Sequence, residues 1–193
     1  IKLYLDNTIM GLYSFSMVFS MLLMTILANL QSIFTYTLNK HSATVETRKL
    51  FKETYQYINY LLIIALMMII VSQLLYYILV NYFLVNYKDS STIFIIFSSM
   101  IYFYAMFIIP SAILSSSVMR KEKIIALIMF IGVISGIIFN AVFINLGWKG
   151  EGIALGTVLS QIVIAGFTLF SFKKYSDDML FKRHGFDILL LTT

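Results

Sequence analysis

The residue types that most often perform catalysis or bind metals are few in this sequence and stand apart from one another. His41 and His184 are far apart, and neither has a second His or Cys at metal-ligand spacing. The chain has no cysteine, which excludes thiolate sites. Gly150, Gly152 and Gly156 lack the GxGxxG spacing of a nucleotide-binding loop. We therefore expect no catalytic residue, no metal and no cofactor, and we expect that the protein is not an enzyme.

A row of polar residues near the start of the chain is more informative. A helix turns by 100° per residue, which places five polar residues and Gly11 on one face. The polar residues are Ser14, Thr25, Asn29, Ser32 and Tyr36. Leu23, Leu27 and Leu30 fall on the opposite face. Hydrocarbon cannot satisfy the carboxamide of Asn29, so the polar face must meet other helices or a water-filled cavity. We favour a cavity that a substrate crosses, with hydrogen bonding between helices as the alternative.

Small residues define two further faces near the other end of the chain. One face carries Gly132, Gly136 and Asn140, and the other carries Gly152, Gly156 and Ser160. Because glycine lets helix backbones approach closely, we expect these two helices to pack as a tight hairpin. A third set, Gln73, Tyr77 and Asn81, repeats at i, i+4 and i+8, and we favour helix packing for it as well.

The composition indicates which elements position these residues. The chain has 193 residues, of which 60% are hydrophobic and 12% charged, whereas a soluble domain has about 45–50% apolar and about 25% charged residues. So few charged residues cannot cover a soluble core. We expect an all-α, polytopic transmembrane helix bundle, because helices satisfy their own backbone hydrogen bonds where water is absent.

Long uncharged stretches mark the expected spans, and each reaches the roughly 20 residues needed to cross a bilayer. The five spans are expected at about 8–38, 57–86, 91–117, 124–146 and 152–172. A sixth apolar run from 187 fits either a truncated span or a C-terminal stub. We assign 1–193 to a single membrane domain. Since the chain starts at Ile1 without an initiator Met, we expect an internal fragment.

Basic residues are concentrated in alternate loops, within segments 39–56, 118–123 and 173–186. These segments hold eleven of the fourteen cations: Lys40, Arg48, Lys49, Lys52, Arg120, Lys121, Lys123, Lys173, Lys174, Lys182 and Arg183. The positive-inside rule predicts that these loops are cytoplasmic and that the first span runs from outside to inside. Topology then explains the net charge of +5 without nucleic acid, and phospholipid headgroups are the expected partners.

Two segments resemble polysaccharide flippases of the Wzx type. Residues 140–161, NAVFINLGWKGEGIALGTVLSQ, resemble a family segment with Asn, apolar residues, a Gly turn and then Gly-x-Ala-x-x-Thr. The opening, IKLYLDNTIMGLYSFS, resembles the start of the first span after the midpoint between the family's two lobes. The resemblance implies membership of the multidrug/oligosaccharidyl-lipid/polysaccharide exporter superfamily, whose members have two six-helix lobes. This chain would be most of the C-terminal lobe.

The resemblance also implies a function. The parent protein would flip undecaprenyl-diphosphate-linked oligosaccharide repeat units across the bacterial inner (cytoplasmic) membrane for surface polysaccharides such as the O-antigen of lipopolysaccharide. The five polar residues 14, 25, 29, 32 and 36 would line the substrate path. The implied partners are membrane lipids, the lipid-linked oligosaccharide, the missing N-terminal lobe and the polysaccharide polymerase machinery.

Three other functions remain open at this point. A drug or metabolite/cation antiporter of the same superfamily would need embedded carboxylates, and no charged residue lies deep in any expected span. An integral-membrane enzyme, such as a glycan polymerase, would need larger outward segments than 87–90 and 146–151. A non-transporting scaffold would have no need for the polar face. We therefore favour the flippase.

Overall fold

The computed structural model describes residues 7–42, 47–116 and 119–190. Its long helices are α1 (Asn7–Ser42), α2 (Thr47–Ile78), α3 (Ser91–Ser115), α4 (Glu122–Asn145) and α5 (Lys149–Leu190). A π-helical segment, η1 (Leu79–Phe83), and a 3-10 segment, η2 (Val85–Ser90), connect α2 to α3. Five helical segments of the described chain are long and apolar enough to cross a membrane. This confirms the predicted all-α fold with five spans, and identifies a multi-pass membrane protein in contact with membrane lipids.

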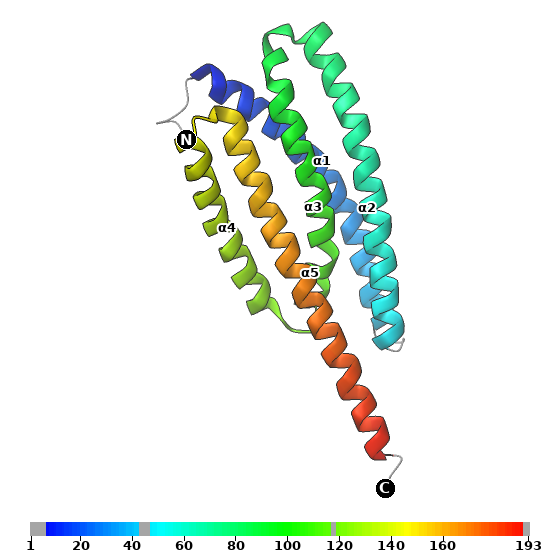
Figure 1. Cartoon of the computed structure of the whole chain (residues 1–193). Helices are drawn as coiled ribbons and strands as arrows, with labels where there is room; N and C mark the ends of the chain where they lie inside the picture. Colours follow the sequence, from blue (N-terminus) through cyan, green and yellow to red (C-terminus); the bar gives the residue numbers. More distant parts are fainter. Residues whose placement is uncertain (1–6, 43–46, 117–118, 191–193) are drawn as a thin grey trace.

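The helices run up and down, so their connections alternate between the two ends of the bundle (Figure 1). The α2–α3 connection and the α4–α5 turn lie at the upper end in this view, and the α3–α4 turn lies at the lower end. The C-terminus of α1 and the N-terminus of α2 also lie at the lower end. Basic residues lie at the adjoining ends of α1 and α2, at the start of α4 and in the last part of α5, which are all at the lower end. We therefore call this lower end the basic end of the bundle.

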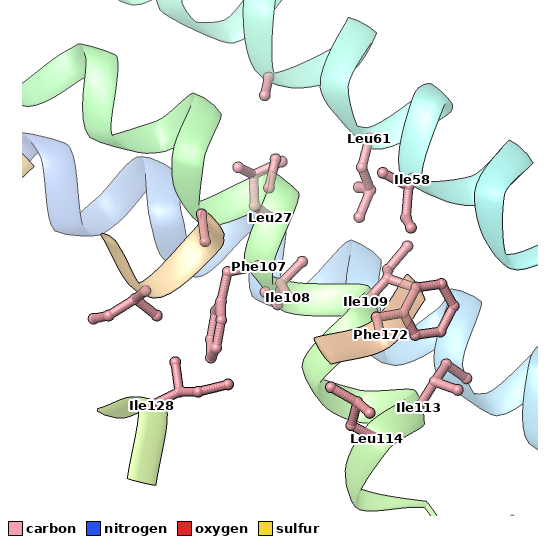
Figure 2. Packing of buried hydrophobic residues seen from close by; sticks show 14 of the residues in the cluster. Leu27, Ile58, Leu61, Phe107, Ile108, Ile109, Ile113, Leu114, Ile128 and Phe172 are labelled. Carbon is pink, nitrogen blue, oxygen red and sulfur yellow. The ribbon is translucent and has the colours of Figure 1, made fainter. Parts of the chain in front are cut away.

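Helix α3 occupies the centre of the bundle and packs against α1, α2 and α5, while α4 packs mainly on α5. All five helices contribute to one apolar cluster, in which Leu27, Leu61, Ile109 and Phe172 are fully buried (Figure 2). In a bilayer the lipid is as apolar as these side chains, so close van der Waals packing holds the helices together. The central position of α3 explains why half of its apolar span is buried.

Two helices extend beyond the predicted spans. The helix that contains the span expected at 57–86 begins at Thr47, and its regular α-helix ends at Ile78, before the π-helical and 3-10 segments. The apolar run from 187, which fits a truncated span or a C-terminal stub, lies at the end of α5, which continues through the basic segment 173–186 to Leu190. Lysine, arginine and glutamate are good helix formers, so charges mark where the membrane ends and not where a helix ends.

Candidate functional site

The inner face of α1 is fixed by contacts with its neighbours. Tyr13, Ser16, Ser20 and Leu27 are buried, and they follow one another at helical spacing. Tyr13 packs edge-on against Phe97 of α3 at 5.2 Å between ring centres. These contacts determine how α1 is rotated in the bundle and therefore which of its residues face outward.

The polar stripe of α1 lies on the outer face, opposite this buried face. Its five polar residues, Ser14, Thr25, Asn29, Ser32 and Tyr36, are all exposed, as is Gly11. Tyr36 is 72% exposed, and Val18, which interrupts the stripe, is 55% exposed. The described helices therefore bring none of the stripe residues into the core. The structure brings them together only as a continuous surface along one helix.

The stripe residues differ in how their hydrogen-bonding groups are satisfied. The Thr25 hydroxyl donates to the Met21 carbonyl at 2.9 Å, and the Ser32 hydroxyl donates to the Asn29 carbonyl at 2.7 Å. Within the described residues, the side chains of Ser14, Asn29 and Tyr36 make no hydrogen bond. A carboxamide has more donors and acceptors than a hydroxyl, so Asn29 has the largest unmet hydrogen-bonding capacity of the three. Asn29 is thus the stripe residue that most requires a polar partner from outside these helices.

A buried hydroxyl cluster, Ser16, Tyr76 and Ser90, joins α1, α2 and η2, and the sequence analysis did not identify it. The Tyr76 hydroxyl lies 2.6 Å from Ser90 Oγ and 3.2 Å from Ser16 Oγ, and Ser16 Oγ also lies 3.1 Å from the Ser90 carbonyl oxygen. Tyr76 stacks on Phe94 at 3.9 Å between ring centres. Tyr76 and Ser90 are both unremarkable in an apolar sequence, so only the tertiary structure reveals the cluster.

The set Gln73, Tyr77 and Asn81 divides into different roles. The Gln73 carboxamide donates to Ser98 Oγ of α3 at 2.7 Å, which joins two helices. Asn81 of η1 donates to the Tyr77 carbonyl at the end of α2 at 2.8 Å, and Tyr77 is 59% exposed. Of the three residues, only Gln73 therefore donates a side-chain hydrogen bond to a neighbouring helix.

The two faces of small residues meet between α4 and α5. A Cβ added at Gly136 would lie 3.3 Å from Ser160 Cβ, and one added at Gly156 would lie 2.9 Å from the Asn140 backbone nitrogen. A Cβ at Gly132 would collide with Ile164, and one at Gly152 would lie 2.8 Å from Phe143 Cβ. The structure thus brings all six residues of the expected hairpin into one close helix–helix contact. Asn140 Oδ1 is buried there without a hydrogen-bond partner.

The described residues contain no group of three or more His, Cys, Asp or Glu side chains that could hold a metal ion. The side chains of His41 and His184 lie outside the described residues. The outer face of α1 is therefore the best candidate for a functional site, and it is a surface that could bind a polar group by hydrogen bonds. Comparison with protein-family models, curated proteins and solved structures finds no match to this chain.

Proposed function

We propose that this chain is part of a membrane transporter that moves a hydroxyl-rich, lipid-linked substrate along the outer face of α1. The observation that carries the proposal is the exposed carboxamide of Asn29, which has no hydrogen-bond partner among the described residues. An unsatisfied amide in hydrocarbon costs several kcal/mol. A water-filled path beside α1 removes this cost, and a second lobe of the transporter would form its other wall.

The proposed substrate is an undecaprenyl-diphosphate-linked oligosaccharide repeat unit, which would be flipped from the inner to the outer leaflet of the bacterial cytoplasmic membrane. The choice rests on the resemblance of residues 140–161 and of the opening segment to the Wzx-type flippases. A glycan has many hydroxyl groups and would lose many hydrogen bonds in hydrocarbon. Ser14, Asn29 and Tyr36 offer a row of neutral donors and acceptors that a glycan can use.

The chemistry of the outer face favours contact with the uncharged glycan part of this substrate over ion-coupled exchange. Its polar residues are uncharged, whereas embedded carboxylates or cations usually mark ion and proton pathways. The mechanism we propose is alternating access, in which the two lobes rock and expose the hydrated path to each leaflet in turn. No covalent bond of the substrate would be made or broken, so the protein would not be an enzyme.

The test is complementation with the intact parent gene in a bacterium that lacks its own O-unit flippase and makes a matching repeat unit. We expect restored surface polysaccharide together with a smaller pool of repeat units held in the inner leaflet. An unchanged pool, with the protein present in the membrane, would contradict flipping. In that case a drug or metabolite/cation antiporter becomes the better explanation.

The site is tested by two matched Asn→Leu substitutions, one on the outer face of α1 and one outside it. Asn29→Leu removes the unsatisfied carboxamide and is expected to reduce export at unchanged membrane abundance. Asn81→Leu serves as the control, because it makes the same substitution outside the stripe, where the carboxamide already donates to the Tyr77 carbonyl at 2.8 Å. Equal export by both variants at equal abundance would refute the assignment of Asn29 to the substrate path.

A further inference from the structure

The basic end of the bundle carries a compact group of cations on α4 and α5. Segments 119–123 and 173–178 contain five cations and three carboxylates. The cations are Arg120, Lys121, Lys123, Lys173 and Lys174, and the carboxylates are Glu122, Asp177 and Asp178. Four of these cations are exposed, and Lys121 is half-buried. Among the side chains that the structure describes, which do not include those of Asp177 and Asp178, none of the five forms a salt bridge. We call these five residues the cationic surface.

Packing places the two segments next to each other. Met119 is buried in the same apolar cluster as Phe172, which joins the α3–α4 turn to α5. The Lys121 ammonium lies 4.6 Å from the centre of the Tyr175 ring, where the ring quadrupole attracts a cation. The cationic surface is therefore built from two elements held together by the fold and is not simply a run of neighbouring residues.

The backbone at Arg120 gives a second, independent observation. Arg120 has a φ of 51°, the left-handed conformation that residues other than glycine rarely adopt. Its amide donates to the Ser116 carbonyl at 2.9 Å, and the amide of Lys121 donates to the Leu114 carbonyl at 2.8 Å. Glycine is the usual residue at such a helix end. The chain thus keeps a cation at the start of α4 at a conformational cost that glycine would not carry.

The position of the cationic surface in the bundle selects its partner. The cations directly border the uncharged stretches 124–145 of α4 and 152–172 of α5, so they lie where hydrocarbon is expected to give way to phospholipid headgroups. Helix α4 packs mainly on α5, whereas α1 packs mainly on α3 and α2. The cationic surface is therefore on a different part of the bundle from the polar stripe of α1.

From these observations we infer that the cationic surface binds the headgroup of an anionic phospholipid. Its charge complements a phosphate-bearing headgroup, and the adjoining apolar spans of α4 and α5 contact the acyl chains. This site would anchor the α4–α5 hairpin at the membrane surface. The inference does not depend on the proposed transport function, since the two surfaces use different residues.

The test measures phospholipid binding to the purified chain in detergent by native mass spectrometry. The probes are phosphatidylglycerol, phosphatidylcholine with the same acyl chains, and inorganic pyrophosphate. The double variant Lys121→Gln/Lys123→Gln is compared with Lys88→Gln/Lys149→Gln, which removes two cations from the other end of the bundle (Figure 1). A cation near a membrane surface changes binding about 5-fold, so we expect the first double variant to bind phosphatidylglycerol about 25-fold more weakly.

The control double variant should change this affinity less than 2-fold, and the wild-type chain should prefer phosphatidylglycerol to phosphatidylcholine. Equal affinities in the two double variants would overturn the inference, as would pyrophosphate binding as tight as that of the lipid. Lys173→Gln/Lys174→Gln repeats the test on α5 if the first variant folds poorly. Tyr175→Leu retains every charge but removes the ring beneath Lys121, and a modest loss of affinity is expected from it.

Discussion

Replacement of Gly156 by alanine offers the sharpest test of the contact between α4 and α5. The new Cβ would lie 2.9 Å from the backbone nitrogen of Asn140 and 3.1 Å from its Cγ. The side chain of Asn140 can rotate away, but its backbone nitrogen can move only if the two helices separate. Overpacking of this kind typically costs about 1–3 kcal/mol.

A matched control on the same helix isolates this cost. Gly166 also lies within the apolar span of α5, but a Cβ added there meets no atom within 4 Å. Both substitutions gain the same helix propensity, which is about 1 kcal/mol for Gly→Ala in a helix interior. The difference in the free energy of unfolding between Gly156→Ala and Gly166→Ala should therefore equal the overpacking cost, with the Gly156 variant less stable by about 1–3 kcal/mol.

The chain contains its own reporter for this measurement. Trp148 is its only tryptophan, and it stacks on Phe143 at the α4–α5 turn with 5.5 Å between ring centres. Its fluorescence during titration of the detergent-solubilised chain with a denaturing detergent follows opening of the hairpin directly. Equal stability of the two variants, within about 0.5 kcal/mol, would mean that α4 and α5 do not approach as closely as the structure has them.

Three further substitutions test other parts of the structure. Gly136→Leu places a large side chain against Ser160 and is expected to lower the yield of folded monomer, whereas a normal yield in size-exclusion chromatography would argue against a close contact. Tyr76→Phe removes the hydroxyl bonded to Ser90 and should lower stability by about 1 kcal/mol in detergent unfolding, and no change would exclude an energetic role for this bond. Arg120→Gly should raise the free energy of unfolding in detergent by about 1 kcal/mol and weaken phosphatidylglycerol binding. A lower free energy of unfolding would contradict the conformational cost assigned to Arg120.

The membrane spans were predictable because hydrocarbon selects strongly against charge, and the charged positions limit each apolar stretch. The helix ends were less predictable, since the charged segment 173–186 continues α5 beyond its uncharged stretch 152–172. Helix propensity is nearly the same for lysine, glutamate and leucine, so the end of an apolar run carries no signal for the end of a helix. No local pattern in the sequence predicts the π-helical turn at Leu79–Phe83.

The candidate site shows the same division between what a helical wheel can and cannot predict. The angular spacing of Ser14, Asn29 and Tyr36 predicted that they share a face, because that property depends only on the helix repeat. Whether the face lies inward depends on every other helix in the bundle. The structure places it outward, with Ser16 and Ser20 buried on the opposite side. The buried serines of α1 therefore contact other helices of the bundle, whereas the polar residues of the stripe face away from it.

The hydrogen bonds of α1 explain this difference between its two sides. On the inner side, Ser20 donates to the carbonyl of Ser16, and Ser16 in turn contacts Tyr76 and Ser90, so the buried hydroxyls have partners within the chain. On the outer side, Asn29 has none among the described residues. If the outer face met only lipid, an apolar residue at this position would be more stable. An asparagine there is consistent with a partner beyond these helices, either the water and glycan of a transport path or a polar group of another lobe.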